Sequence, residues 1–264
     1  MRSAYGEWSQ RGRRVILPVA VTTLLLAVVV GVAVSVLRSE HSGTGGGPAA
    51  TSVPAASGRE VADDLAKLVV APEAPMTGYS REQFPHWDHN KPEHGFGPDF
   101  AQYGRCTTRE VMLLRDAVGP VRLDPKTCEL TVGKDGGWRD QYGVLDRKTG
   151  KLAPYKFITD PKSVDAEHIV PLAEAWRSGA GSLDENTRRD IANDAANLVA
   201  SDPSANRSKG DQDPSGYLPP GNFRCAYVAH YIKVKIKYGL TVDPAEQSAL
   251  RTAVDDCTRR GGFA

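Results

Sequence analysis

The pattern of apolar and polar positions divides the chain into three parts. Residues 15–37 form an apolar run that only a few small or polar residues interrupt. Residues 38–58 are mostly Gly, Ser, Thr, Ala and Pro, a composition typical of a flexible linker. From residue 59 onward, apolar residues recur at helical and strand spacings, which predicts one folded domain over 59–264.

The apolar run of residues 15–37 predicts a membrane segment. As a helix it would be about 34 Å long, enough to cross a hydrocarbon core of about 30 Å. Arginines crowd its N-terminal side: Arg2, Arg11, Arg13 and Arg14. This asymmetry places residues 1–14 in the cytoplasm and the domain outside, on a transmembrane signal-anchor. The alternative is a secreted protein whose signal peptide is cleaved near Ala33-Val34-Ser35; the length of the run favours the anchor.

In the first half of the domain, helical spacing predicts a short helix from residue 59 to the stop at Ala71-Pro72. Thr107 and Glu110 form a capping box that opens a helix through residue 118. Two short strands, 121–124 and 129–132, flank a proline-containing turn. Residues 133–161 are expected to be mostly loop.

In the second half, the pattern predicts a strand over 164–170, then two helices, the second opened by a capping box of Ser182 and Glu185. A second strand, 197–200, precedes a short helix that Asp202 caps and Gly210 ends. Alternation over 232–238 favours a strand, whereas residues 225–231 favour a helix. Residues 245–257 are expected to be helical.

The chain contains four cysteines, Cys106, Cys128, Cys225 and Cys257, which allow three pairings. No two of them form a CxxC motif, so a zinc knuckle is not favoured. Outside the cytoplasm disulfides are expected. Pairing of nearest neighbours, Cys106 with Cys128 and Cys225 with Cys257, closes two short loops, and we predict this pairing. Four free thiols would require a cytosolic protein.

Residue types suited to phosphodiester hydrolysis gather between residues 165 and 211. His168 can act as a general base for water. Glu167 and Asn206 offer the hard oxygen ligands that Mg²⁺ or Mn²⁺ prefers. Lys209 follows Asn206 by three residues, so both share one face of the predicted short helix, where Lys209 can bind phosphate. Asn197, on the second strand, can bind the backbone near His168 and hold that loop.

The same stretches carry a family resemblance. The pattern D-x-E-H-I-V-P at 165–171, followed by N-L at 197–198 and N-R-x-K-G-D at 206–211, resembles the HNH, or ββα-metal, endonucleases. The predicted order of strand, strand and short helix agrees with that motif. The resemblance extends over residues 79–257 to secreted or anchored HNH proteins of the DUF1524 type. It implies an α+β domain with added helices and two disulfides around a ββα-metal core.

The resemblance also implies roles for individual residues. His168 would activate water, Glu167 and Asn206 would bind one divalent metal ion, and Asn197 would orient the histidine. Lys209 matches a basic residue found in many members. Glu167 stands where aspartate is commoner, which puts the metal distance in doubt, and Tyr217 stands where tryptophan is expected.

Two further residues have two interpretations each. Strand alternation puts Asp165 on the same face as Glu167, either as a metal ligand or as a hydrogen-bonding neighbour. The same alternation aims Glu167 and His168 at opposite faces, so we expect the strand to bend there. Arg109 can contact substrate phosphate, or it can pair with a local carboxylate.

Two other groups of residues resemble sites but are better explained as surface. His86, His89 and His94 suggest zinc, yet they lack a matching cysteine pair, and an exposed polar loop is favoured. Lys233, Lys235 and Lys237 could follow a phosphate backbone; a solvated face is at least as well supported.

Composition bounds the function only loosely. Hydrophobic residues make up 40% of the chain, which suffices for a core, and the net charge of +1 is a weak signature for a nucleic-acid binder. We predict a nuclease that cleaves DNA, with RNA as an alternative substrate, using one Mg²⁺ or Mn²⁺ ion and showing little sequence specificity. A non-catalytic binding or scaffolding module and a phosphodiesterase for small molecules or envelope phosphodiesters are the other two hypotheses.

Overall fold

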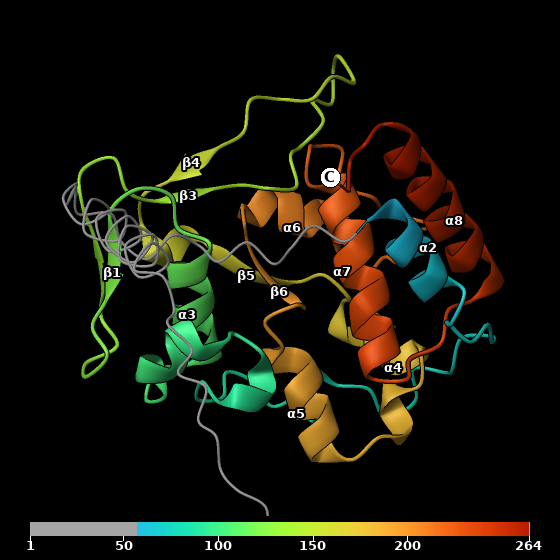
Figure 1. The fold of residues 1–264 in the computed structure, drawn as a ribbon, viewed down its shortest axis with the longest axis horizontal. Coiled ribbons are helices and arrows are strands. Elements are labelled where there is room, and N and C mark those ends of the chain that lie inside the picture. The colour runs from blue at the N-terminus through green and yellow to red at the C-terminus, as the bar shows by residue number, and fades with distance from the viewer. Residues whose placement is uncertain (1–56, 264) are drawn as a thin grey trace, which may run out of the picture. The chain divides into compact units, whose positions relative to one another are not determined.

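The computed structural model describes residues 57–263 and shows a mixed α+β fold (Figure 1). The predicted membrane segment, residues 15–37, lies outside these residues. The described helices are α2 (Gly58–Leu65), α3 (Thr108–Arg115), α4 (Leu172–Arg177), α5 (Glu185–Asn193), α6 (Pro203–Lys209), α7 (Arg224–Lys237) and α8 (Pro244–Arg259). The described strands are β1 (Val121–Leu123), β2 (Leu130–Val132), β3 (Trp138–Arg139), β4 (Phe157–Ile158), β5 (Asp165–His168) and β6 (Leu198–Ser201).

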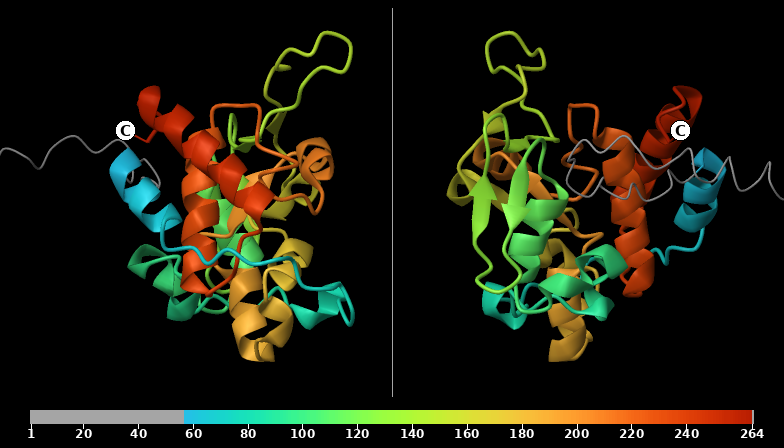
Figure 2. Two further views of the ribbon diagram at one scale, coloured as in Figure 1. Left: turned by 90° about the vertical axis from the view of Figure 1, so that its right-hand side faces the viewer. Right: turned by 60° about the vertical axis from the view of Figure 1, so that its left-hand side comes forward.

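The strands form three separate antiparallel pairs, β1 with β2, β3 with β4, and β5 with β6. Helices α2, α7 and α8 pack together on one side, whereas α3 lies with the strands on the other (Figure 2). The β5–β6 pair lies between two hydrophobic clusters. This position makes the pair the centre of the fold.

All four residues of β6 are buried, and they alternate between the two clusters. Leu198 and Ala200 belong to the cluster that includes α3, whereas Val199 belongs to the cluster around α7. Since successive side chains of a strand point to opposite faces, only a strand that is covered on both sides can bury four consecutive residues.

Local capping signals set most helix boundaries as predicted. Both hydrogen bonds of the capping box of Thr107 and Glu110 are present at the start of α3. The side chain of Asp202 accepts from the Ser204 backbone N–H and opens α6, and Gly210 ends it with a φ of 56°. Helix α5, in contrast, is capped by Asp184 rather than by the predicted Ser182.

The ambiguous segment from residue 225 is one continuous helix, α7, so the alternation over 232–238 does not produce a strand. Apolar burial at helical spacing decides the outcome, because Val228, Tyr231, Ile232 and Val234 all enter the core. The lysines do not form a stripe, since residues two apart in a helix face different directions. Lys233 is exposed and Lys235 is buried.

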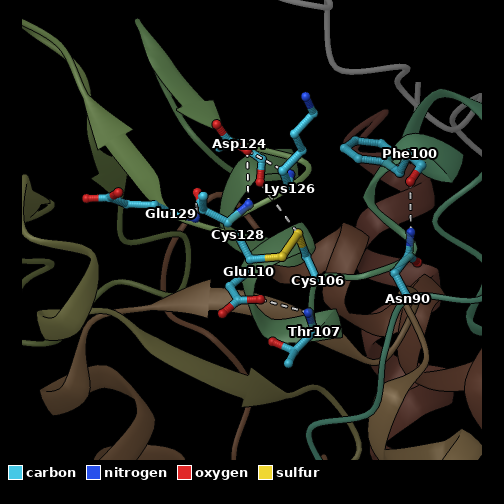
Figure 3. Close-up of a disulfide and its surroundings, with 10 residues drawn as sticks. Asn90, Phe100, Cys106, Thr107, Glu110, Asp124, Lys126, Cys128 and Glu129 are labelled. Atoms are coloured by element: carbon cyan, nitrogen blue, oxygen red, sulfur yellow. Dashed lines mark hydrogen bonds between the residues drawn. A yellow bond between two sulfur atoms is a disulfide. The ribbon is translucent and has the colours of Figure 1, made fainter.

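Both disulfides have the predicted pairing. Cys106 joins Cys128 with a Cα–Cα distance of 5.2 Å, and Cys225 joins Cys257 at 5.6 Å. The first bridge ties the chain before α3 to the turn before β2, next to the cap of α3 (Figure 3). The second ties α7 to α8. In the chain-entropy model, loops of this length contribute about 3 kcal/mol each.

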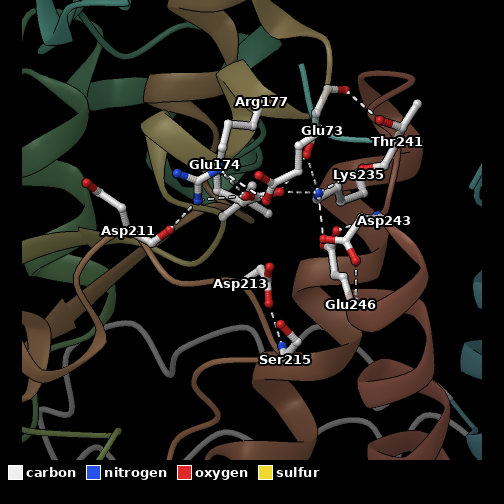
Figure 4. A network of polar contacts seen from close by, with 12 residues as sticks. Glu73, Glu174, Arg177, Asp211, Asp213, Ser215, Lys235, Thr241, Asp243 and Glu246 are labelled. Carbon is white, nitrogen blue, oxygen red and sulfur yellow. Dashed lines mark hydrogen bonds and ion pairs between the residues drawn. The ribbon is translucent and has the colours of Figure 1, made fainter. Parts of the chain in front are cut away.

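A buried ammonium group connects α7 to α4 and α8 (Figure 4). Lys235 Nζ lies 2.8 Å from Glu174 Oε1 and 2.9 Å from Glu246 Oε1, and all three side chains are at most 1% exposed. Burial raises the pKa of Glu246 to about 7, although Lys235 opposes this shift. The ammonium therefore compensates two carboxylates that have lost their hydration.

We expect Lys235→Met to lower the free energy of unfolding by about 3–5 kcal/mol, the range for removing one partner of a buried ion pair. The methionine keeps the apolar stem but leaves Glu246 without its cation and Glu174 with Arg177 alone. Denaturant unfolding measures the loss. Lys233→Met, at an exposed position of the same helix, is the matched control and should change stability by less than about 0.5 kcal/mol.

Candidate active site

Strands β5 and β6 and helix α6 form a strand–strand–helix unit, in the order that the sequence predicts. Buried contacts fix the start of α6. Asp140 Oδ1 accepts from the Asp202 backbone N–H at 3.1 Å, and Lys156 Nζ lies 2.9 Å from Asp202 Oδ1. The N-terminus of α6 is therefore attached to the β3–β4 region, while the body of the helix contacts β5.

His168, the last residue of β5, is buried and fixed in one orientation. Its Nε2 lies 2.9 Å from the carbonyl oxygen of Ala192. A carbonyl only accepts, so Nε2 carries the proton and Nδ1 keeps its lone pair in the neutral ring. The ring of Trp87 stacks parallel to the imidazole, with centroids 5.7 Å apart. Burial lowers the pKa of His168 to about 3, so the imidazole is neutral at ordinary pH.

Asn197 lies just before β6 and is fully buried. Its Oδ1 accepts from the Val170 backbone N–H at 2.8 Å, and its Nδ2 donates to the Ile191 carbonyl at 3.0 Å. These bonds connect the segment after His168 to the end of α5, whose Ala192 carbonyl holds the histidine. The contact with the backbone near His168 is the one that the sequence led us to expect; a role of Asn197 in catalysis stays a prediction.

Glu167 and Lys209 form a buried ion pair between β5 and α6. Lys209 is fully buried, and its Nζ also donates to the His168 carbonyl at 2.8 Å. Burial raises the pKa of Glu167, while the charge of Lys209 lowers it. An ammonium that is enclosed in this way has no donor directed at solvent. In this arrangement Lys209 is not available for the phosphate contact that we expected of it.

Asp165, at the other end of β5, contacts α6 through Asn206. Asn206 Nδ2 lies 3.0 Å from Asp165 Oδ2, and both side chains are half-buried. The structure therefore brings Asn206 to Asp165, whereas Glu167 is engaged by Lys209. The sequence led us to expect Glu167 and Asn206 beside one ion, with Asp165 as a further candidate.

The Asp165–Asn206 pair fits a divalent cation. A rotation of the Asn206 amide by a half-turn exchanges its nitrogen and oxygen, which are assigned from hydrogen bonding alone. Two oxygens would then face each other at this separation. Neighbouring ligands of an octahedral Mg²⁺ ion with bonds of about 2.1 Å lie about 3.0 Å apart. The pair thus offers two ligands that can belong to one coordination shell.

The expected bend between Glu167 and His168 is absent. The ladder continues in register through Glu167–Val199 and His168–Leu198. Glu167 consequently faces α6, and His168 faces α5 and Trp87. The metal-ligand candidates and the base candidate lie on opposite faces of β5.

Two other candidates, Arg109 and His94, have structural contacts. Arg109 donates to the carbonyls of Pro161 and Val164 at 3.1 and 3.0 Å, so it holds the chain before β5, and within residues 57–263 it pairs with no carboxylate. His94 is buried, with Nε2 3.3 Å from Asp88 Oδ2. Within the described part of the chain, no group of side chains that could share a metal includes a histidine.

The sequence reasoning missed the surroundings of His168. Trp87 and His86 both contact the His168 ring, with the His86 ring edge-on at 6.1 Å, and neither was assigned a role. The sequence feature that could have pointed to them is their position in residues 79–87, which belong to the region with the family resemblance. Asp140 and Lys156, which hold α6, stand in a segment without periodicity, and no local signal marks them.

Comparison with known proteins supplies the family. Residues 135–253 match the C-terminal domain of GmrSD restriction endonucleases. An uncharacterized secreted protein of the fungus Arthroderma benhamiae is 36% identical over 213 residues, which cover 80% of this chain and 90% of the fungal protein. The chain belongs to the same family as this fungal protein. The restriction-endonuclease match spans β3 to most of α8 and all of the β5–β6–α6 unit, so this part of the chain is similar to a nuclease domain. No solved structure matches the chain.

The comparison corrects the expected localisation. The fungal relative is a secreted protein, and this finding contradicts our prediction that residues 15–37 anchor the domain in a membrane. Among residues 57–263, no helix is both long and apolar enough to cross a membrane. The membrane is therefore withdrawn as a predicted partner.

We expect Asn197→Leu, which keeps the size of the side chain, to destabilise the protein by roughly 2–4 kcal/mol, because two buried backbone groups each lose a partner worth about 1–3 kcal/mol. The Val170 N–H should also exchange faster with deuterium. Asn186→Leu, at an exposed position of α5, serves as the control and should leave both measurements unchanged. Wild-type stability of Asn197→Leu would show that these bonds do not hold the loop.

Proposed function

We propose that this protein is a secreted, metal-dependent endonuclease of the HNH type, which hydrolyses phosphodiester bonds of nucleic acid, DNA in the first place. The observation that carries the proposal is the β5–β6–α6 unit, which presents a neutral, oriented histidine at the end of one strand and brings Asn206 of the helix to Asp165 of that strand. The family match supports a nuclease-type function.

His168 is the proposed general base. With its Nε2 proton held by Ala192, the ring offers Nδ1 to a water molecule and cannot rotate away. The stacked Trp87 ring excludes solvent from one face of the imidazole. Burial keeps the free enzyme's histidine neutral, so the base needs no prior deprotonation. The imidazolium that forms on proton transfer is stabilised by the Ala192 carbonyl.

Asp165 and Asn206 are the proposed metal ligands, with the Glu167–Lys209 ion pair fixing α6 so that Asn206 lies opposite Asp165. A bound Mg²⁺ or Mn²⁺ ion would supply charge stabilisation for the phosphate and the departing 3′-oxygen. Because His168 and these ligands lie on opposite faces of β5, the proposal puts the scissile phosphate at the half-exposed edge of that strand, within reach of both.

We expect His168→Ala to lower the rate of metal-dependent cleavage by about 10²–10⁴, the usual effect of losing a general base. Affinity for nucleic acid should remain near that of wild type, since the proposed ligands are intact. Plasmid, single-stranded DNA and RNA, each with Mg²⁺, Mn²⁺ or EDTA, provide the assay for the full chain. The exposed His89, replaced by alanine, is the control. A scaffolding protein would instead show no cleavage in wild type, and equal rates for wild type and His168→Ala would refute the assignment.

Asp165→Asn should raise the concentration of Mg²⁺ or Mn²⁺ required for half-maximal cleavage by at least about tenfold, because one charged ligand is lost. Isothermal titration of the metal alone gives an independent measurement of the same change. Glu167→Gln tests the prediction from the sequence that Glu167 is a metal ligand. If only Glu167→Gln shifts the metal requirement, Glu167 rather than Asp165 is the ligand, and Lys209 must leave it when the metal binds.

A further inference from the structure

An arginine lies on the His168 side of β5, outside the sequence motif of the site. Arg81 begins a short 3₁₀ helix, Arg81–Gln83, and is exposed. Its Nε lies 3.3 Å from His86 Nε2, and the His86 ring meets the His168 ring edge-on, with centroids 6.1 Å apart. His86 therefore connects the guanidinium to the proposed base.

The hydrogen bonds of His86 fix the direction of this contact. His86 Nδ1 lies 2.5 Å from the Phe84 carbonyl, which can only accept, so Nδ1 carries the proton. Nε2 is then an acceptor, and Arg81 Nε donates to it. This bond uses one donor of the guanidinium and leaves its two terminal NH₂ groups for another ligand.

Two other cations beside β5 are already engaged. Lys209 is buried against Glu167, and Arg109 is bound to two carbonyls. Within residues 57–263, Arg81 has no carboxylate at ion-pair distance, and its side chain makes one hydrogen bond, the one to His86. Its terminal donors are thus free for an anion.

The segment that carries Arg81 and His86 is held rigidly on α5. Arg188 donates to the Gln83 carbonyl at 2.8 Å, and Asn193 donates to the Pro85 carbonyl at 2.9 Å. Phe84, between them, is fully buried. Helix α5 also supplies the Ala192 carbonyl that orients His168, so one helix positions both the histidine and the arginine.

We propose that Arg81, positioned by His86, binds a phosphodiester oxyanion of the substrate at this site, the role that the sequence suggested for Lys209. This inference rests on the proposed nuclease function. A guanidinium presents two parallel N–H donors that match two phosphate oxygens, and such charge-assisted bonds are stronger than neutral ones. Arg81 would therefore contact the phosphate from the base side of β5.

The test measures binding separately from cleavage. In the His168→Ala background, with EDTA, fluorescence anisotropy gives the affinity for labelled duplex DNA, single-stranded DNA and RNA at several salt concentrations. Arg81→Gln should weaken binding about tenfold at low salt and reduce the slope of log affinity against log salt by about one, as expected for one lost phosphate contact. Arg251→Gln, at an exposed position of α8, should leave affinity and slope unchanged.

Cleavage assays in the otherwise wild-type chain complete the design. Arg81→Gln should lower kcat/KM by about 10–100-fold, the effect of losing hydrogen bonds to a charged group. Arg81→Lys should restore the salt dependence of binding but not the full cleavage rate. Lysine keeps the positive charge but lacks the two parallel N–H donors of the guanidinium. His86→Ala should lower kcat/KM while leaving the salt slope intact, as a positioning residue would. The melting temperature of each variant should match that of wild type.

The outcomes separate this inference from the proposed function. If wild type cleaves nucleic acid and Arg81→Gln retains wild-type affinity, salt slope and rate, the inference is wrong and the nuclease assignment stands. If wild type cleaves nothing with any divalent metal, the nuclease assignment fails. The binding data alone then test the inference about Arg81. A tenfold loss of affinity and a smaller salt slope in Arg81→Gln support it, and an unchanged affinity and slope overturn it.

Discussion

The buried ion pair of Glu167 and Lys209 is the constraint on which the arrangement of the site depends. Removing both charges from water is costly, and their attraction compensates this only when the geometry is close. Lys209 also donates to the His168 carbonyl, so one ammonium fixes α6 against the end of β5. Asn206 precedes Lys209 by about one helical turn, and Asp165 precedes Glu167 by two strand residues. The ion pair thereby sets the register that brings Asn206 to Asp165.

The two buried faces of the β5–β6 pair carry different chemical groups. The face toward α6 carries carboxylates, which the helix compensates with Lys209 and Asn206. The face toward α5 carries the imidazole, which a carbonyl orients and which burial keeps neutral. Keeping the base away from the carboxylates removes the charges that would raise its pKa. The arrangement favours a neutral histidine and a pair of carboxylates on opposite faces of one short strand.

Sequence reasoning succeeded where the signal was local. Cap residues such as Thr107 and Asp202 act within one turn, and the nearest-neighbour disulfides close short loops, so both were predicted correctly. The strand–strand–helix order followed from periodicity and breakers. It was incomplete where distant segments decide. The local pattern did not show that Lys209 pairs with Glu167, which stands 42 residues away, and it left α7 open between helix and strand because its apolar residues meet a core formed by distant segments.

The weak net charge of the chain is consistent with the charge distribution at this site. Lys209 and Lys235 form buried ion pairs with carboxylates, so their charges contribute nothing to the electrostatic field at the protein surface. A protein with a net charge of +1 attracts nucleic acid only weakly at long range. In the proposed nuclease, recognition would then depend on contacts at the site, namely the exposed guanidinium of Arg81 and a cation between Asp165 and Asn206. Both would bind phosphate oxygens, which are the same in every sequence, so such an enzyme should discriminate little between bases.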